Sequence, residues 1–299
     1  MGNILKPEFK KKNFDFNDCS PQRFYKSQWC KSKWVYLAIK LVLFGYWFGW
    51  FLYVMTAGSI NQSLHKYWLF LTNWGVVTIL LYFITSTLVV IYGIAKDSEQ
   101  PHETKMPNTV SGSIDRSTGL KSNLKVSSDT RENPNLRWFH KIVWILQSVS
   151  VNGAIIIGIS YWSLLSNGEE TASSINSHAI NIVIMIIDLF LNDIPVRLLH
   201  FYHSSLYTFV YSVFSLIVHA SGYTSAIYPV LDWQNNVGMA IGLCLGITFI
   251  ASPVVHALVF FTFYQLRLFI AQQTVLSTVV APAVTLLEID NPTFKKDEV

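Results

Sequence analysis

The feature that most constrains this chain is the length of its segments without a charged residue. Between Tyr67 and Ala95 there are 29 consecutive residues without Asp, Glu, Lys or Arg. An α-helix needs about 20 apolar residues to cross the hydrocarbon core of a bilayer. Comparable segments recur along the chain, at 34–58 (interrupted only by Lys40), 142–168, 171–187, 198–231 and 233–266. The sequence therefore predicts a multi-span membrane protein rather than a soluble domain.

The composition agrees with this interpretation. Hydrophobic residues make up 51% of the 299 residues and charged residues 13%, which is about half the charged fraction of an average soluble protein. Three cysteines are too few for a disulfide framework, and the sequence contains no spacing of Cys and His typical of a metal site. We therefore expect an all-α integral membrane bundle that is held by helix packing, with no metal or other cofactor.

Apolar length and helix punctuation together predict six transmembrane helices, at 34–57, 67–94, 139–165, 177–197, 204–221 and 236–266. The sequence stays mostly apolar as far as Leu287, so a seventh span or an interfacial helix is the alternative for that region. The chain then divides into a basic N-terminal tail (1–33), a membrane domain (34–271) and a C-terminal segment (272–299). A polar loop (96–135), rich in Ser, Thr, Asn, Pro and Lys, is predicted to be disordered.

The distribution of Lys and Arg predicts the orientation in the membrane. If the N-terminus is cytosolic, nineteen of the 22 basic residues lie on the cytosolic side and only Lys66 lies outside. Such an excess is the signal that orients membrane helices. The other two, Lys40 and Lys141, fall near cytosolic ends of spans, where their side chains can extend along lipid to the headgroups. Both termini are thus predicted to be cytosolic, and the plasma membrane is the expected location.

Two modification sites follow from this orientation. The sequon Asn61-Gln62-Ser63 falls in the first outer loop, where N-glycosylation takes place. Cys30 lies a few residues before the first span on the cytosolic side, which is a position typical of reversible acylation. The alternatives are a sequon too close to the membrane for use and an unmodified thiol.

Polar residues within the predicted spans are candidates for function, because an unpaired polar group in lipid is costly. Asn181, Asp188 and Asn192 are separated by seven and four residues, which brings them to one face of the fourth span. We expect this face to contact protein, and Asp188 to pair with His256 of the sixth span or Asn152 of the third. Such a pair either fixes the register of two helices or handles protons.

A second polar group lies at the predicted outer end of the bundle. Thr72, near the start of the second span, and His178, at the start of the fourth, fall at nearly the same depth. An imidazole can remove the proton of a threonine hydroxyl and make it nucleophilic. Asn73, Asn181 or backbone N–H groups are candidate donors to an oxyanion. The alternative is structural, with the Thr72 hydroxyl bonded to the carbonyl of Trp68 one turn earlier.

Three stretches of the sequence carry a family resemblance. They are Phe70-Leu-Thr-Asn-Trp-Gly75, His178-Ala-Ile-Asn-Ile-Val-Ile-Met-Ile-Ile-Asp-Leu-Phe190 and Pro195-Val-Arg-Leu-Leu-His-Phe201. From about residue 34 to about residue 270, the chain resembles the rolling stone family of multi-span membrane proteins. The resemblance implies a role at the cell surface in muscle development and myoblast fusion.

Rolling stone proteins are in turn distantly similar to the androgen-induced and androgen-dependent membrane hydrolases. Those enzymes cleave fatty acid esters of hydroxy fatty acids with an intramembrane threonine and a histidine. By this similarity, the threonine falls on Thr72, after Lys66 and Tyr67, and the histidine falls on His178. The chain departs from the hydrolase pattern in a longer interval between Tyr67 and Thr72, and in Asn181 at the place of a second histidine.

The sequence therefore supports two functions. One is a rolling-stone-type protein that acts in cell-surface events through membrane lipids or through membrane or cytosolic protein partners. The other is a hydrolase of lipid esters that uses Thr72 and His178. A channel or transporter is disfavoured, because there are no rings of charge and no internal repeat. No feature of the sequence points to a nucleic acid partner.

Overall fold

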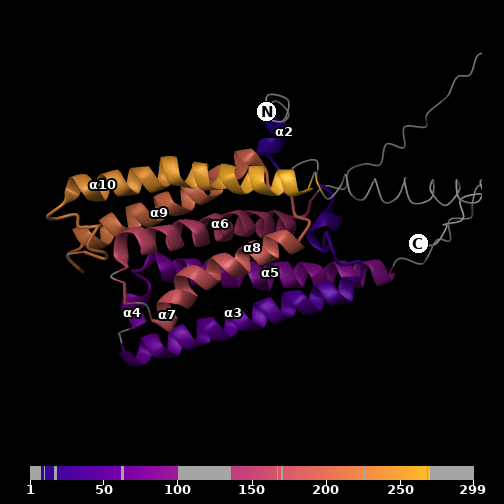
Figure 1. Ribbon diagram of the computed structural model, residues 1–299, viewed down its shortest axis with the longest axis horizontal. Helices are drawn as coiled ribbons and strands as arrows, with labels where there is room; N and C mark the ends of the chain where they lie inside the picture. Colours follow the sequence, from indigo (N-terminus) through magenta and orange to yellow (C-terminus); the bar gives the residue numbers. More distant parts are fainter. Residues whose placement is uncertain are drawn as a thin grey trace, which may run out of the picture.

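The computed structural model describes residues 8–9, 11–16, 19–61, 64–99, 136–166, 168–169, 171–224, 226–267 and 269. Within these residues the chain is all-α, and the one strand-like pairing is an isolated antiparallel bridge between Ser27 and Asn192. The same residues contain six helical segments long and apolar enough to cross a membrane: Lys33–Thr56, Leu71–Ser98, Trp138–Leu165, Ala172–Leu191, Leu198–Ala220 and Val237–Arg267. They lie side by side in an elongated bundle (Figure 1), which confirms the predicted fold class.

The six segments are built from α3 (Lys33–Asn61), α5 (Leu71–Glu99), α6 (Trp138–Ser160), α8 (Asn181–Leu191), α9 (Phe201–Ala220) and α10 (Val237–Gly246). The shorter helices are α2 (Lys11–Phe14), η1 (Pro21–Phe24), α4 (Leu64–Tyr67), α7 (Ala172–Ile175) and η4 (Leu198–His200). Figure 1 shows α4 and α7 at one end of the bundle, which we name the α7 end. The other end, where η1 lies, is named the η1 end.

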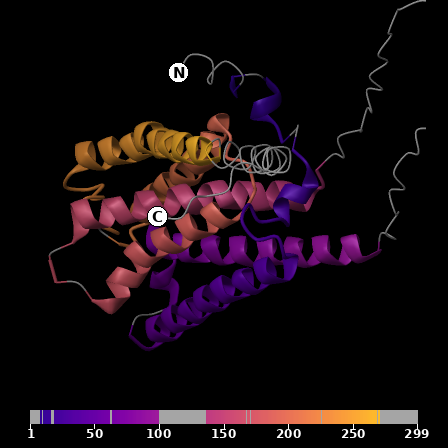
Figure 2. The ribbon, with the colours of Figure 1, turned by 45° about the vertical axis from the view of Figure 1, so that its right-hand side comes forward.

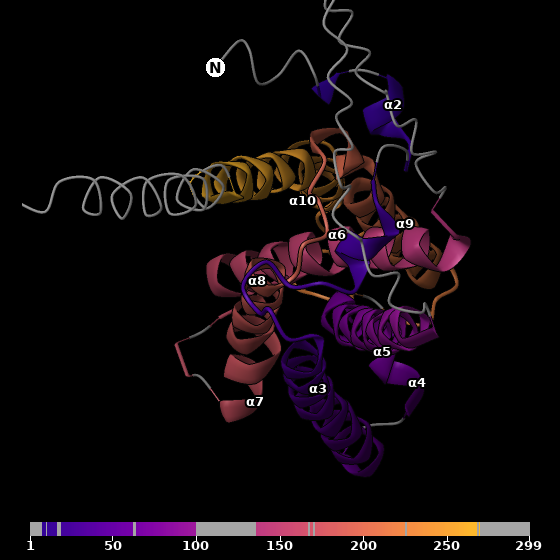
Figure 3. The ribbon, with the colours of Figure 1, turned by 90° about the vertical axis from the view of Figure 1, so that its right-hand side faces the viewer.

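Helix α6 forms the centre of the bundle and packs against α5, α8 and α9. In the most apolar 18-residue stretch of its span 67% of the residues are buried, whereas in the corresponding stretch of the span formed by α3, at the edge of the bundle, 22% are buried. Figure 3 shows α6 between α5 and α8 below and the α9–α10 pair above. Small residues on α6 allow this close packing, because they let neighbouring backbones approach. At Gly158, an added Cβ would overlap the Ile182 side chain and lie 2.7 Å from the His178 carbonyl oxygen.

Three of the spans contain a π-helical turn, in which one extra residue widens the helix. These turns are η2 (Tyr161–Leu165), η3 (Asn176–Ile180) and η5 (Ile247–Ala251). The turn η5 ends two residues before Pro253, whose ring would clash with a carbonyl of a regular helix. Since π-turns are unusual and occur frequently at functional sites, their positions are of interest for the site described below.

The fourth span differs at both ends from its predicted range of 177–197. It begins at Ala172, because the Thr171 side chain accepts a hydrogen bond from the Ser174 N–H at 3.0 Å. It ends at Leu191, because Asn192 takes an extended conformation and donates its side-chain amide to the Asp188 carbonyl at 2.9 Å. Residues 192–197, which include a proline, then run without helix to η4.

Residues 19–32, named here the N-terminal segment, fold against the η1 end of the bundle (Figure 2). Phe24 is 1% exposed and packs edge-on against the ring of Trp144. The Ser27 hydroxyl donates a hydrogen bond to the Leu191 carbonyl at 2.7 Å. This packing was not foreseen in the sequence, where the residues belong to a basic tail, because their apolar positions follow no helical or strand period.

Several predictions fall outside the described residues. They concern most of the predicted disordered loop 96–135, of which only residues 96–99 are described, and the C-terminal segment 272–299 with its alternative seventh span. The orientation of the termini is likewise a prediction from the charge distribution, because the helices themselves carry no information on which side is cytosolic.

Candidate functional site

A cavity of about 70 Å³ near the α7 end is lined by both Thr72 and His178. Seven helical elements and the connection between α9 and α10 contribute to its wall. The wall is mainly aliphatic, and its aliphatic members are Leu71, Ile157, Leu164, Leu165, Val230, Leu231, Leu243 and Ile247. Each of the three π-turns supplies at least one residue, among them Tyr161, His178 and Ile247. The cavity therefore combines a mainly apolar surface with one imidazole and several hydroxyls, among them that of Thr72.

Thr72 lies in the first turn of α5, because that helix begins at Leu71 rather than at Tyr67 as predicted. The Tyr67 carbonyl accepts a hydrogen bond from the Asn73 side-chain amide at 2.7 Å. The Trp68 carbonyl accepts from the Trp74 indole at 2.8 Å. These side-chain bonds satisfy carbonyls that a longer helix would use, so the chain turns and the helix starts later.

His178 lies in the π-turn η3 and is 8% exposed. Its ring stacks on that of Tyr161 in η2, with the centroids 3.7 Å apart and the planes 3° from parallel. The two π-turns thus face each other across the α6–η3 contact. Gly158, one turn before η2, allows this approach because it has no side chain between the two backbones.

The amides of Asn73 and Asn181, predicted as oxyanion donors, do not line the cavity. Asn73 donates to the Tyr67 carbonyl, and Asn181 donates to the Ser177 carbonyl at 2.7 Å. Both therefore bind backbone carbonyls close in sequence, which is the usual partner of a polar side chain in an apolar surrounding.

Tyr228, in the connection between α9 and α10, reaches the cavity beside Thr72 and was not predicted. Its hydroxyl oxygen accepts the Leu71 N–H at 2.9 Å, and both Tyr228 and Thr72 line the cavity. Burial raises the pKa of the Tyr228 phenol, while the bonds from Leu71 and Thr72 act in the opposite direction. Tyr211 also lines the cavity and donates to the Leu69 carbonyl at 2.8 Å. Tyr228 lies in a connection without periodicity, so the sequence alone gave no signal for it.

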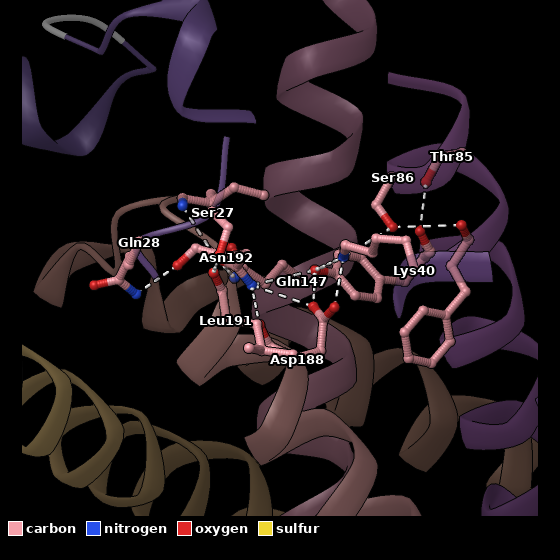
Figure 4. Close-up of polar contacts among 12 residues, drawn as sticks. Ser27, Gln28, Lys40, Thr85, Ser86, Gln147, Asp188, Leu191 and Asn192 are labelled. Atoms are coloured by element: carbon pink, nitrogen blue, oxygen red, sulfur yellow. Dashed lines mark hydrogen bonds and ion pairs between the residues drawn. The ribbon is translucent and has the colours of Figure 1, made fainter. Parts of the chain in front are cut away.

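Asp188, on α8, forms a buried ion pair with Lys40 of α3 (Figure 4). Lys40 Nζ lies 2.6 Å from Asp188 Oδ1, and both side chains are 1% exposed. The Tyr82 hydroxyl donates to Asp188 Oδ2, and the Asn192 amide donates to the same oxygen at 3.2 Å. The Gln147 amide donates to Asn192 Oδ1 at 3.1 Å. The network joins α3, α5, α6 and α8.

This ion pair corrects two predictions. Asp188 pairs with Lys40 and not with His256 or Asn152. Lys40 does not extend along lipid to the headgroups, because its ammonium is enclosed between helices and has a carboxylate as its partner. A charge buried in the bundle requires such a partner, since the isolated ion would lose its hydration without compensation.

His256 and Asn152 instead bind each other. Asn152 Nδ2 lies 2.8 Å from His256 Nδ1, and His256 Nε2 lies 2.8 Å from the Arg197 carbonyl. The geometry fits a ring that accepts at Nδ1 and donates at Nε2. His256 therefore connects α6, the last span and the extended residues before η4, at a distance from the Thr72 cavity, which it does not line.

The two predicted modification sites stay predictions. Cys30 is half-buried, and its backbone N–H donates to the Ser27 hydroxyl at 3.2 Å. Asn61 is the last residue of α3, and the other two sequon residues, 62 and 63, lie outside the described residues. Among the residues that are described, no group of three or more His, Cys, Asp or Glu is placed to hold a metal ion.

Residues 113–287, which are more than half of the chain, match the family model described as Protein rolling stone. The chain belongs to the rolling stone family. A curated relative, Protein rolling stone of Drosophila melanogaster, is 26% identical over 241 residues, which cover 76% of this chain and 78% of the relative. No solved structure matches the chain.

Family membership confirms the resemblance noted in the sequence. Together with the six long apolar helices, it identifies a multi-pass integral membrane protein of the rolling stone type. The range that matches the family model contains His178, Asp188 and His256, whereas Thr72 and Lys40 lie before it.

Proposed function

We propose that this rolling stone protein hydrolyses a lipid ester in the cavity that Thr72 and His178 share. The observation that carries the proposal is the shared cavity itself, in whose wall the Thr72 hydroxyl and the His178 imidazole come from two separate spans. The aliphatic wall suits the apolar carbons next to an ester group, and substrate pockets are usually apolar with few polar groups. The distant similarity to the androgen-induced hydrolases points to a fatty acid ester of a hydroxy fatty acid as the substrate class.

In the first step, the Thr72 oxygen attacks the ester carbonyl carbon and its proton passes to His178. The tetrahedral intermediate then collapses, the bond to the alcohol oxygen breaks, and His178 returns the proton to the departing alcohol. Water next attacks the acyl group on Thr72 with His178 again as base. The fatty acid leaves and the Thr72 hydroxyl is restored.

Tyr228 supports this chemistry as a donor to the oxyanion. Its hydroxyl oxygen accepts the Leu71 N–H, so its own proton is available for the oxyanion of the attacked ester. It takes the role that Asn73 and Asn181 do not fill, because their amides bind backbone carbonyls. Hydroxyl donors of this kind stabilise the negative charge of a tetrahedral intermediate.

The test is an ester hydrolysis assay on the purified full chain in detergent micelles, combined with labelling by a fluorophosphonate probe. We expect T72A and H178N to lower the hydrolysis rate at least about 100-fold, which is the usual effect of losing a nucleophile or its base. T72S should keep part of the activity and the labelling.

The matched control is T78A, on the same helix. The Thr78 hydroxyl bonds to the Trp74 carbonyl at 2.8 Å and does not line the cavity, so its loss should leave the rate unchanged. Wild-type protein without hydrolysis and without labelling would contradict the proposal, as would equal rates for T72A and T78A.

Membership of the rolling stone family supports a second role, in cell-surface events such as myoblast fusion. In this role the protein resides in the plasma membrane with cytosolic termini and acts through membrane lipids or protein partners. A fusion assay in cultured myoblasts that express wild type or T72A separates the two functions. Fusion by T72A would show that the fusion role does not require hydrolysis.

An epitope at either terminus tests the orientation, since antibody should bind it only after the cells are permeabilised. Staining of intact cells would contradict cytosolic termini. The same staining reports which membrane contains the protein.

A further inference from the structure

A second cavity, of about 260 Å³, is lined by Arg23, Arg197 and Arg267. The three arginines come from distant parts of the sequence, namely η1, the extended residues before η4, and the end of the last span. Figure 1 shows these parts together at the η1 end of the bundle, away from α4 and α7. Convergence of three guanidinium groups on one cavity is unusual in a chain with so few charges, and it needs an explanation.

The acidic groups beside the cavity do not balance the arginines. Arg23 Nη2 lies 3.1 Å from Asp193 Oδ1, and Arg197 Nη1 lies 3.6 Å from Glu8 Oε1. Arg267 donates to the Ile194 carbonyl at 2.6 Å, and within the described residues it forms no ion pair. Among the described residues, three guanidinium groups against two carboxylates leave one positive charge in excess.

Two guanidinium donors at the cavity lack an acceptor. Within the described part of the chain, Arg197 Nε and Arg267 Nε are buried without a hydrogen-bond partner. A buried donor without an acceptor is costly, so an oxygen-rich anion that accepted from both would remove that cost. The planar guanidinium group matches the oxygens of a phosphate particularly well.

We propose that this cavity binds the phosphate-bearing headgroup of an acidic phospholipid. The cavity wall includes Phe260, Phe263 and Tyr264 of the last span, and Arg267 lies at the end of the same span. The outer face of that same helix is apolar, with Val254 51% and Leu258 62% exposed. Acyl chains can lie along this face while the headgroup reaches the arginines. This continuity favours a lipid over a free phosphate.

The charge distribution agrees with this ligand. The η1 end contains the arginines that the positive-inside pattern assigns to the cytosolic side, and the cytosolic leaflet holds the acidic lipids. Glu8 is the one carboxylate in the described wall of the cavity. It would repel a phosphate, so the site predicts a specific effect of its removal: E8Q should bind an acidic headgroup more tightly than wild type.

Native mass spectrometry of the purified full chain in detergent tests the proposal, with phosphatidylinositol 4-phosphate as the probe and phosphatidylcholine as the neutral lipid. We expect selective binding of the acidic lipid. R267Q should weaken it about tenfold or more, since charge-assisted hydrogen bonds would be lost. The matched control is R137Q, which removes the same charge at an exposed position that does not line the cavity.

Equal binding by R267Q and R137Q would overturn the proposal, because the effect would then be one of net charge alone. Equal binding of phosphatidylcholine would overturn it as well. Inorganic phosphate and inositol 1,4-bisphosphate serve as soluble competitors, and binding of these as tight as that of the lipid would assign the site to a free phosphate. If R267Q fails to fold, E8Q tests the same site, because removal of the Glu8 charge should strengthen lipid binding rather than weaken it. Unchanged lipid binding by E8Q would then count against the proposal.

Discussion

The ammonium group of Lys40 lies 2.6 Å from the carboxylate of Asp188, and neither side chain is more than 1% exposed. This contact joins the first and fourth spans, and Tyr82 and Ser86 of α5 complete the surroundings of the two charges. Each ion alone would be very unstable in an apolar bundle, whereas the pair compensates both charges. The relative position of α3 and α8 therefore depends on this contact.

The variant D188N leaves the Lys40 ammonium buried without a counter-charge. Removal of one partner from a buried pair costs about 3–5 kcal/mol, so we expect a clear loss of stability. Thermal unfolding in detergent, followed by circular dichroism, measures the effect. The matched control is D15N, at an exposed position, with an expected change of about 0.5 kcal/mol or less. A melting temperature for D188N equal to that of D15N would refute the importance of the pair.

The double variant K40M/D188L distinguishes a need for charge from a need for packing. Replacement of a buried ion pair by apolar residues of similar volume is often neutral. We therefore expect the double variant to recover most of the stability that D188N loses. A double variant less stable than D188N would show that the polar network has a role beyond compensation of charge.

The variant G158A should displace η3 from α6. The new Cβ would overlap the Ile182 side chain and lie 2.7 Å from the His178 carbonyl oxygen, which is backbone and cannot rotate away. Such overpacking costs about 1–3 kcal/mol, and it should also lower ester hydrolysis because it moves His178. G153A on the same helix is the control, since a Cβ there meets nothing within 4 Å. Unfolding and hydrolysis assays that fail to separate the two variants would be evidence against this account.

The variant G93A should loosen the N-terminal segment. Gly93 faces the ring of Tyr25, and a Cβ at this position would overlap that ring. A cost of about 1–2 kcal/mol would raise the population of the open segment roughly 5–30-fold. Limited trypsin digestion at Arg23 and Lys26 reports this opening as faster cleavage. G45A, where a Cβ has no neighbour within 4 Å, should be cleaved at the wild-type rate. Equal cleavage of both variants would contradict the predicted contact.

The Cys19 thiol should react slowly with iodoacetamide. Burial raises the pKa of this thiol to about 11, although Arg23 and Arg197 nearby act in the opposite direction. Only the thiolate reacts, so in the folded protein the rate should rise about tenfold per pH unit from pH 7 to pH 10. In the unfolded chain it should level off near pH 8.5.

The same pKa difference has a consequence for stability. Above pH 9 the unfolded chain loses a proton that folded Cys19 retains, so stability should fall between pH 9 and pH 11. C19S should lose this component of the pH dependence. Mass spectrometry of the alkylated peptide measures the rate, and a folded-state rate that levels off near pH 8.5 would contradict the raised pKa.

Much of the architecture was predictable from the sequence. The six spans follow from charge-free length, which is a local property of the chain, and Thr72 and His178 could be placed at one depth from their distances to the span ends. The ends of individual helices were less predictable. The fourth span stops at Leu191 because the side chain of Asn192 and the distant Ser27 take over its last hydrogen bonds.

What only the tertiary structure decided is which polar groups meet. The sequence shows that Asp188 needs a partner, since a lone carboxylate is unstable in an apolar bundle, and both His256 and Lys40 lay within the membrane domain. The choice of Lys40 depends on the rotation of each helix about its own axis, which is set by packing over the whole bundle. The same holds for Tyr228, whose connection reaches Thr72 only because α9 and α10 pack beside α5. The lengths of the apolar segments and the positions of the charges determine the depth of each residue in the membrane. Contacts between distant segments determine which polar side chains pair.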